Sequence, residues 1–321
     1  MRNDLHLTPW VISHRGPGWV DEFCESVFFL GNGRIGIRGY LSSEPAHRPI
    51  QKGIYLAGIF GEIKPGITDF VNLPTPVWEN IQIDGSAAEL ASDVERVLNL
   101  QEATLTLRYA LRSGEKLLQV EYQRFLPKEH PALILQRLKL TPGADMELTV
   151  SSGILTESCN SPIPDDQTKA NTETIQLSYP IRISASSERI SCVFTVRGSG
   201  LTVSQAVSFY SPGFTCSRSG GAENTYQAPA ASGQVLILDK IASVRTSRDV
   251  DPRIADIPED WTYDALLSGH RAAWAATWKK CDLDISPLGP ELQAGLRFSI
   301  FHLLGSCSTK DPTVSIGARG L

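Results

Sequence analysis

The sequence lacks the features that mark several classes of protein. It has no C-x-x-C pair among its six cysteines and no H-x-x-x-H pair among its six histidines, so no metal site is indicated. No apolar run approaches the roughly 18–20 residues of a membrane span, and the N-terminus carries no apolar segment typical of a secretory signal. The net charge of −5 gives no basic footprint for nucleic acid. We therefore expect a cytoplasmic protein with reduced cysteines and with neither a nucleic-acid nor a membrane partner.

A long series of alternating segments is present instead. Between Ala103 and Leu111 apolar residues alternate with polar ones, Ser113-Gly114 supplies a turn, and the alternation resumes from Leu118 to Tyr122. Many short strands separated by Gly/Pro clusters favour an antiparallel sandwich over βαβ units, so the predicted fold class is mainly β. Further strands are predicted at 133–140, 146–150, 181–185, 191–196, 201–209 and 234–244, and turns at 141–143, 197–200 and 217–221.

The period changes after about Asp249, where two helices are predicted. One helix carries a single apolar stripe, in which the tryptophans are interpreted as core-facing anchors rather than sugar-stacking platforms: Leu267, His270, Trp274, Trp278 and Cys281. The other is predicted to begin at Pro290 and is apolar around its whole axis as far as Leu304, so it should be largely buried. The single histidines of these helices are interpreted as hydrogen-bonded core residues.

The second helix also leads to an expectation about the chain as a whole. A helix this apolar needs packing partners that the residues up to Leu321 do not supply, so we expect a truncated chain. Uncovered apolar surface favours association. Residues 1–321 are therefore expected to self-associate or bind a hydrophobic dye, and a chain ending near Asp249 is expected to be better behaved.

The densest motif of the chain is a glycine-rich segment, Glu25-Ser-Val-Phe-Phe-Leu-Gly-Asn-Gly-Arg-Ile-Gly-Ile-Arg-Gly39. Residues 31–36 match G-x-G-x-x-G, the pattern of dinucleotide-binding loops. Such a loop opens a helix whose N-terminus binds pyrophosphate, whereas residues 37–43 contain another glycine and no helical period. We therefore interpret the glycines as positions of close backbone approach or positive φ. They are Gly31, Gly33, Gly36 and Gly39.

Polar and aromatic residues near this motif are candidates for binding. Asn32, Arg34 and Arg38 could hold a sugar or a phosphate, but a structural role is favoured, with an arginine paired to Glu25 or a neighbouring carboxylate. Trp78 follows two prolines in a segment predicted to be a stiff loop, where an exposed aromatic can contact a ligand. Spacing places no pair of carboxylates on one rigid face, as glycoside chemistry usually requires. No catalytic residue is therefore assigned from the residues alone.

Taken in order, several segments resemble glycoside hydrolase family 65, the family of maltose, kojibiose and trehalose phosphorylases. The match covers nearly the whole chain, and two features depart from the family pattern: Arg34 replaces an aromatic or aliphatic residue, and the 284–291 linker is not acidic. The matching segments are 10–12, 25–39, 53–55, 70–74, 99–108, 123–126, 246–249, 270–278, 296–304 and 315–321.

This resemblance implies a β super-sandwich over residues 1–249, a helical linker over 250–289, and the start of an (α/α)6 barrel over 290–321. It implies an inverting phosphorylase that uses an α-glucosyl disaccharide and inorganic phosphate, without another cofactor, and that makes β-glucose 1-phosphate. A glutamic acid protonates the leaving oxygen in such enzymes, and it is expected beyond residue 321. Arg319, Gly320 and Trp78 are then the candidates for sugar contact, and a homodimer is a candidate assembly.

Two alternatives stay open. One is a family 65 hydrolase acting on trehalose or on a glucosyl side chain, in which water and a base replace phosphate. The other is a non-catalytic carbohydrate-binding β-sandwich, because a complete β domain could end near Val244.

Overall fold

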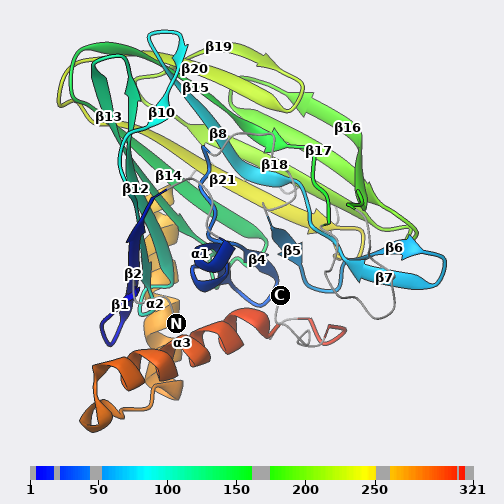
Figure 1. Cartoon of the computed structure of the whole chain (residues 1–321). Coiled ribbons are helices and arrows are strands. Elements are labelled where there is room, and N and C mark those ends of the chain that lie inside the picture. The colour runs from blue at the N-terminus through cyan, green and yellow to red at the C-terminus, as the bar shows by residue number, and fades with distance from the viewer. Residues whose placement is uncertain are drawn as a thin grey trace.

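Two stacked antiparallel sheets form the body of the protein, as the computed structural model shows for residues 5–17, 22–43, 53–160, 174–250, 261–308 and 311–314 (Figure 1). In spatial order, the eleven-stranded sheet consists of β1 (Leu5–Leu7), β2 (Val11–Gly16), β11 (Val94–Asn99), β12 (Thr104–Ser113), β13 (Lys116–Phe125), β14 (Leu133–Pro142), β21 (Leu236–Thr246), β18 (Thr202–Tyr210), β17 (Arg189–Val196) and β16 (Ser178–Ala185), with β10 (Glu89–Leu90) paired to β12.

A five-stranded sheet packs against the large one, and residues 30–70 form two small sheets. The five-stranded sheet has the order β19 (Thr215–Gly220), β20 (Glu223–Ala230), β15 (Met146–Leu155), β8 (Thr75–Ile83) and β9 (Ser86–Ala87). The small sheets are β3 (Leu30–Gly31), β4 (Ile35–Ile37) and β5 (Ile54–Leu56), and β6 (Phe60–Lys64) with β7 (Ile67–Phe70); α1 (Glu22–Val27) precedes them.

The predicted fold class is confirmed. Each predicted strand overlaps an observed strand, and β12 pairs with β13 across the turn predicted at Ser113-Gly114. Alternate residues of the two large sheets meet in one apolar core, which includes Leu107 and Tyr122 from the larger sheet and Ile81 from the smaller one. Period-two alternation of residue type thus identified the central strands, although burial alternates clearly in β13 and much less in β12, where residues on both faces are covered.

Three segments predicted to be irregular lie wholly or partly in strands, and one of them is the turn predicted at 141–143, whose first two residues end β14. Trp78 lies in β8 rather than in a loop, and Pro76 is accommodated because the pairing of β8 with β15 is irregular between Gly153 and Leu155. Proline lacks the amide proton that a regular ladder uses, and irregular positions tolerate it. The cluster predicted as a turn at 217–221 is mostly strand β19, and only its last residue lies in the turn to β20.

A buried ion pair crosses the interior between the two large sheets. The Nζ of Lys240 on β21 lies 3.4 Å from the carboxylate of Glu79 on β8, and neither side chain has any exposed surface. Lys240 also donates to the carbonyl of Trp78 at 2.9 Å. Removing one member of such a pair leaves the other charge buried and unpaired, which is costly. The pair therefore ties the two sheets together.

Helix α2 (Tyr263–Cys281) packs on the outer face of the eleven-stranded sheet. Its N-cap Thr262 accepts a hydrogen bond from the amide of Ala265. The predicted apolar stripe of α2 is turned toward the sandwich, and Trp274 and Trp278 are buried there. This confirms their interpretation as core anchors. The first turn of the helix covers an apolar cluster on β13, β14 and β21, formed by Phe125, Leu133, Leu135 and Ile241 with Tyr263, Leu266 and Leu267.

Helix α3 (Pro290–Ser306) begins where the sequence predicted and runs across one end of the sandwich beside α2 (Figure 1). A 3-10 turn, η2 (Ser286–Leu288), precedes it. The expectation that α3 is largely buried is wrong for this chain: only the face with Ala294, Arg297 and Phe301 is covered, while Leu292 and Leu303 are 58% and 63% exposed. The covered face meets the sandwich, and the described residues place nothing over the other side.

Arg297 attaches α3 to the rest of the molecule. Its guanidinium donates two hydrogen bonds of 2.8 Å to the Asp282 carboxylate and one of 3.1 Å to the carbonyl of Pro9. It also lies 3.7 Å from the centre of the Trp10 ring, within the range of a cation–π contact. One side chain thus joins α3, the end of α2 and the start of β2. No helix among the described residues is long and apolar enough to cross a membrane.

Candidate functional site at the junction of sandwich and third helix

The glycine-rich motif forms a tight loop between β3 and β4 that meets the C-terminal end of α3. Gly33 has a φ of +84° and donates its amide to the carbonyl of Gly305 at 2.6 Å. A Cβ atom on Gly33 would lie 2.2 Å from the carbonyl oxygen of Cys307, and one on Gly31 would lie 2.7 Å from that of Gly305. Both positions therefore require glycine because two backbones touch. A strand, not a helix, follows the loop, so the geometry is not that of a dinucleotide-binding loop.

Asn32 connects the same loop to a neighbouring turn. Its side-chain oxygen accepts the amides of Arg34 at 3.1 Å and of Ile35 at 2.9 Å, which fixes the loop from within. Its side-chain nitrogen donates to the carbonyls of Pro127 and Pro131 at 3.4 and 3.2 Å, in the turn that follows β13. Both polar atoms of its side chain thus have partners within the protein.

Arg34 pairs with a carboxylate that lies far away in the sequence. Its two terminal nitrogens bind Asp249 at 2.8 and 2.6 Å, in the bidentate arrangement that planar guanidinium groups favour. Asp249 also accepts the amide of Thr246 at 2.7 Å, just after β21. The ion pair fastens the end of the sandwich to the loop.

The remaining motif residues lie on the other side of β4. Arg38 reaches the carboxylate of Glu25 in α1 at 3.3 Å, and Gly39 donates its amide to the Glu25 carbonyl at 2.8 Å. A Cβ atom on Gly39 would lie 2.7 Å from that of Phe28, and Gly36 pairs with Gly31 in the small sheet. These contacts hold α1 against β3 and β4.

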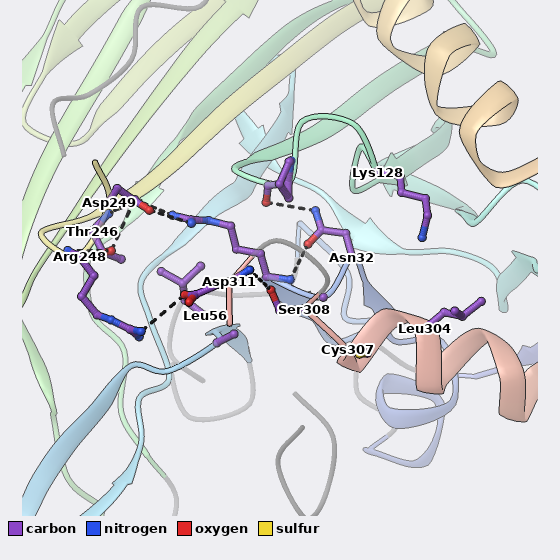
Figure 2. A pocket seen from close by; sticks show the side chains of 14 residues that line it. Asn32, Leu56, Lys128, Thr246, Arg248, Asp249, Leu304, Cys307, Ser308 and Asp311 are labelled. Atoms are coloured by element: carbon purple, nitrogen blue, oxygen red, sulfur yellow. Dashed lines mark hydrogen bonds and ion pairs between the residues drawn. The ribbon is translucent and has the colours of Figure 1, made fainter. Parts of the chain in front are cut away.

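A cavity of about 160 Å³ opens where the loop, the end of the sandwich and the end of α3 converge. In Figure 2, Arg248 and Asp249 line one side, and Lys128 and Leu304 line the other. The whole lining comprises Asn32, Gly33, Arg34, Leu56, Ala57, Lys128, Pro131, Thr246, Arg248, Asp249, Leu304, Cys307, Ser308 and Asp311. Sequence reasoning did not bring these residues together, because no local pattern links positions so far apart.

Both carboxylates of the cavity are held in their ionised form. Burial tends to raise the pKa of Asp249, but the hydrogen bonds from Arg34 and from the Thr246 amide outweigh it, so the pKa lies below its usual value. Hydrogen bonds from Thr313 lower the pKa of Asp311. A general acid for glycoside cleavage needs a proton near neutral pH, and therefore a raised pKa. Neither group is suited to that role.

The residues proposed to contact sugar are not brought together. Trp78 is partly exposed on β8 and does not line the cavity. Arg319 and Gly320 lie outside the described residues. Within the described part of the chain, no three His, Cys, Asp or Glu side chains are placed to hold a metal ion.

Comparison with known proteins decides the family. Residues 22–277 match the model of the glycosyl hydrolase family 65 N-terminal domain, which is most of the chain. The chain belongs to glycosyl hydrolase family 65. An uncharacterized glycosyl hydrolase of Mycobacterium tuberculosis is 26% identical over 98% of the chain and 26% of its own length. A kojibiose phosphorylase of Halothermothrix orenii is 24% identical over 92% of the chain and 40% of its own length.

A solved structure has the same fold. A human-microbiome protein assigned as a kojibiose phosphorylase superimposes with a TM-score of 0.75 over 98% of the chain and 44% of its own length, at 13% sequence identity. At this identity the likeness establishes the architecture alone. The chain thus spans less than half the length of each of these three proteins.

Proposed function

We propose that the chain is the N-terminal part of an inverting α-glucoside phosphorylase. The observation that carries the proposal is the match along 92% of the chain to a kojibiose phosphorylase, together with the family 65 domain match. The sandwich, α2 and the docked face of α3 act in this proposal as a scaffold for an active site formed largely by other residues. The two carboxylates of the cavity described above are ionised and lie beside arginines. This supports placing the catalytic acid outside the scaffold.

In the proposed reaction, a glutamic acid outside residues 1–321 gives its proton to the glycosidic oxygen as the bond from C1 to that oxygen breaks. Inorganic phosphate attacks C1 from the opposite face, and its oxygen forms the new bond with inversion. The products are a free sugar and β-glucose 1-phosphate. Phosphate is itself the nucleophile, so the scheme requires no protein base.

The decisive experiment uses the purified protein at its full encoded length. We would incubate it with α-glucosyl disaccharides of different linkage, with and without inorganic phosphate, and follow β-glucose 1-phosphate and free glucose. We expect the sugar phosphate to form with at least one disaccharide and only when phosphate is present. Release of free glucose at the same rate without phosphate would refute the proposal.

A hydrolase is the second candidate, because the Mycobacterium tuberculosis relative is named as a glycosyl hydrolase. Water would then replace phosphate and would need a carboxylate base to activate it. The same incubation separates the two candidates, since a hydrolase releases two free sugars in the absence of phosphate.

A further inference from the structure

The segment that follows α3 is held by parts of the sandwich that lie far apart in the sequence. Gly33 binds the last turn of α3 through the Gly305 carbonyl, as described above. The guanidinium of Arg248, just beyond β21, donates to the carbonyl of Gly58 at 3.1 Å and lies 3.5 Å from the Asp311 carboxylate. It also donates to the hydroxyl of Thr313.

These contacts leave the segment little freedom. Asp311 donates its amide to the Ser308 hydroxyl at 3.1 Å, and its carboxylate accepts the amide of Thr313 at 2.9 Å, so Asp311 is bonded to residues on both sides of it. Arg248 and Asp311 both line the cavity, where the guanidinium of Arg248 approaches the carboxylate of Asp311 (Figure 2). Within the described residues, the last turn of α3 contains no basic side chain that could bind its terminal carbonyls. The amide of Gly33 is therefore a principal contact at this helix end.

We infer that Gly31, Gly33 and Arg248 form a positioning clamp that fixes the direction in which the chain leaves α3. This inference rests on the proposed function where it concerns catalysis. In a phosphorylase of the proposed kind, residues 307, 308 and 311–314 precede in sequence the 315–321 segment, which contains the candidate sugar contacts Arg319 and Gly320. The clamp residues then control substrate affinity without touching the substrate.

Glycines elsewhere in the chain provide a matched control for the clamp. Gly66 has a φ of +77°, close to the +84° of Gly33, but a Cβ atom there would meet nothing within 4 Å. Alanine at either position strains the backbone by a similar amount. Only alanine at position 33 also collides with the carbonyl of Cys307. The difference between Gly33→Ala and Gly66→Ala therefore isolates the docking contact from the backbone strain.

The half-buried thiol of Cys307 reports directly on the clamp. We would label the chain with a small maleimide under native conditions and quantify each cysteine by peptide mass spectrometry. Cys216 on β19, also half-buried, serves as the internal reference. Arg248 makes charge-assisted hydrogen bonds, so Arg248→Ala should raise the Cys307 labelling rate, relative to Cys216, by about tenfold or more. Gly33→Ala should do the same, and Gly66→Ala should match the unaltered chain.

The labelling experiment has two outcomes that would overturn the clamp. An unchanged rate of Cys307 labelling in Arg248→Ala would show that the contacts do not hold the segment. Equal acceleration at Cys307 and Cys216 would mean general destabilisation rather than local release. Arg248→Ala removes only side-chain contacts, so the test stands even where Gly33→Ala fails to fold.

Kinetics at full encoded length test the link to substrate. Arg248→Ala should raise KM for the disaccharide about tenfold at temperatures where the variant stays folded, while Gly66→Ala leaves KM unchanged. Arg248→Lys should fall between, because an ammonium keeps the charge but lacks the planar fork. Unchanged KM beside faster Cys307 labelling would refute the role in substrate affinity. Absence of any phosphorolysis would instead refute the proposed function, and the labelling result would still decide the clamp.

Discussion

Acidification is predicted to destabilise the attachment of α2 through His270. This side chain is 2% exposed, and its Nε2 lies 3.2 Å from the carbonyl of Ala103. Its ring packs on Phe125 and Trp274, with centroids 4.9 and 6.4 Å away. Burial lowers the pKa of His270 to about 4. The positive charges of Lys128 and Arg271 also lower this pKa, whereas hydrogen bonds to the backbone raise it.

The sign and size of the effect follow from linkage. An unfolded histidine has a pKa of about 6.5, so between pH 6.5 and 4 the unfolded chain binds a proton that the native protein excludes. The free energy of unfolding therefore falls as the pH drops through this window. With a native pKa of about 4, the loss at pH 4.5 is about 2.5 kcal/mol relative to neutral pH.

The assay is urea denaturation followed by tryptophan fluorescence at several pH values between 7.5 and 4.5. We would compare the unaltered chain with His270→Gln, which cannot be protonated in this range, and with His6→Gln as an exposed control. Carboxylates titrate equally in all three proteins, so the difference isolates His270. The reasoning is refuted if His270→Gln loses as much stability as the unaltered chain between pH 6.5 and 4.5.

Three further predictions concern the ion pair, the helices and activity. Lys240→Met should lower the free energy of unfolding by about 3–5 kcal/mol in urea denaturation because Glu79 stays buried without its partner. Adding Glu79→Gln should recover much of this loss, and no recovery would contradict the account. Residues 1–321 should bind a hydrophobic dye through the uncovered side of α3, with Leu292 and Leu303 exposed, whereas a dye-silent, monodisperse monomer would contradict it. Residues 1–321 alone should show no phosphorolysis or hydrolysis of α-glucosides in a sensitive sugar-phosphate and glucose assay, and any turnover would contradict the proposed location of the acid.

The structure changes one expectation about shorter chains. The sequence suggested that a chain ending near Asp249 would be better behaved, because it lacks the apolar helix that begins at Pro290. Such a chain also lacks α2, whose first turn covers Phe125 and Ile241 on the outer face of the sheet. Exposing that cluster costs free energy in proportion to its area. Light scattering should therefore show more association for a chain ending near Asp249 than for one that retains α2.

Local sequence patterns were sufficient where burial is periodic. Alternation identified β12 and β13, and the stripe of His270, Trp274 and Trp278 identified α2, because each pattern has the period of its element. Patterns failed where context overrides propensity. Pro76 led to the prediction of a loop where the structure has β8. A regular ladder would exclude proline, but the irregular pairing of β8 with β15 tolerates it.

One feature that the sequence predictions missed could have been predicted from the sequence. Asp84-Gly85, between β8 and β9, is a two-residue hairpin turn in which both residues have positive φ, of 50° and 72°. Asp-Gly between apolar segments is a strong short-range indicator of such a turn. It would have indicated that the segment containing Trp78 is a strand.

The candidate site could not be assembled from the sequence in the same way. Arg34 and Asp249 are 215 positions apart, and Gly33 meets the carbonyl of Gly305 only after the sandwich has folded and α3 has docked. The sequence could show that the glycines were needed for close approach. It could not show which backbone approaches.

The Gly31–Gly36 loop shares a physical principle with the dinucleotide-binding loops whose pattern it matches. Glycines there let backbone amides reach the oxygens of a pyrophosphate at the positive end of a helix. Here a glycine amide reaches a carbonyl oxygen at the C-terminal end of α3, where the helix dipole places partial negative charge. In both cases the absence of a side chain exposes an amide donor to an electron-rich oxygen. The pattern therefore indicates an exposed amide, and the partner of that amide depends on whether a helix begins after the loop or ends against it.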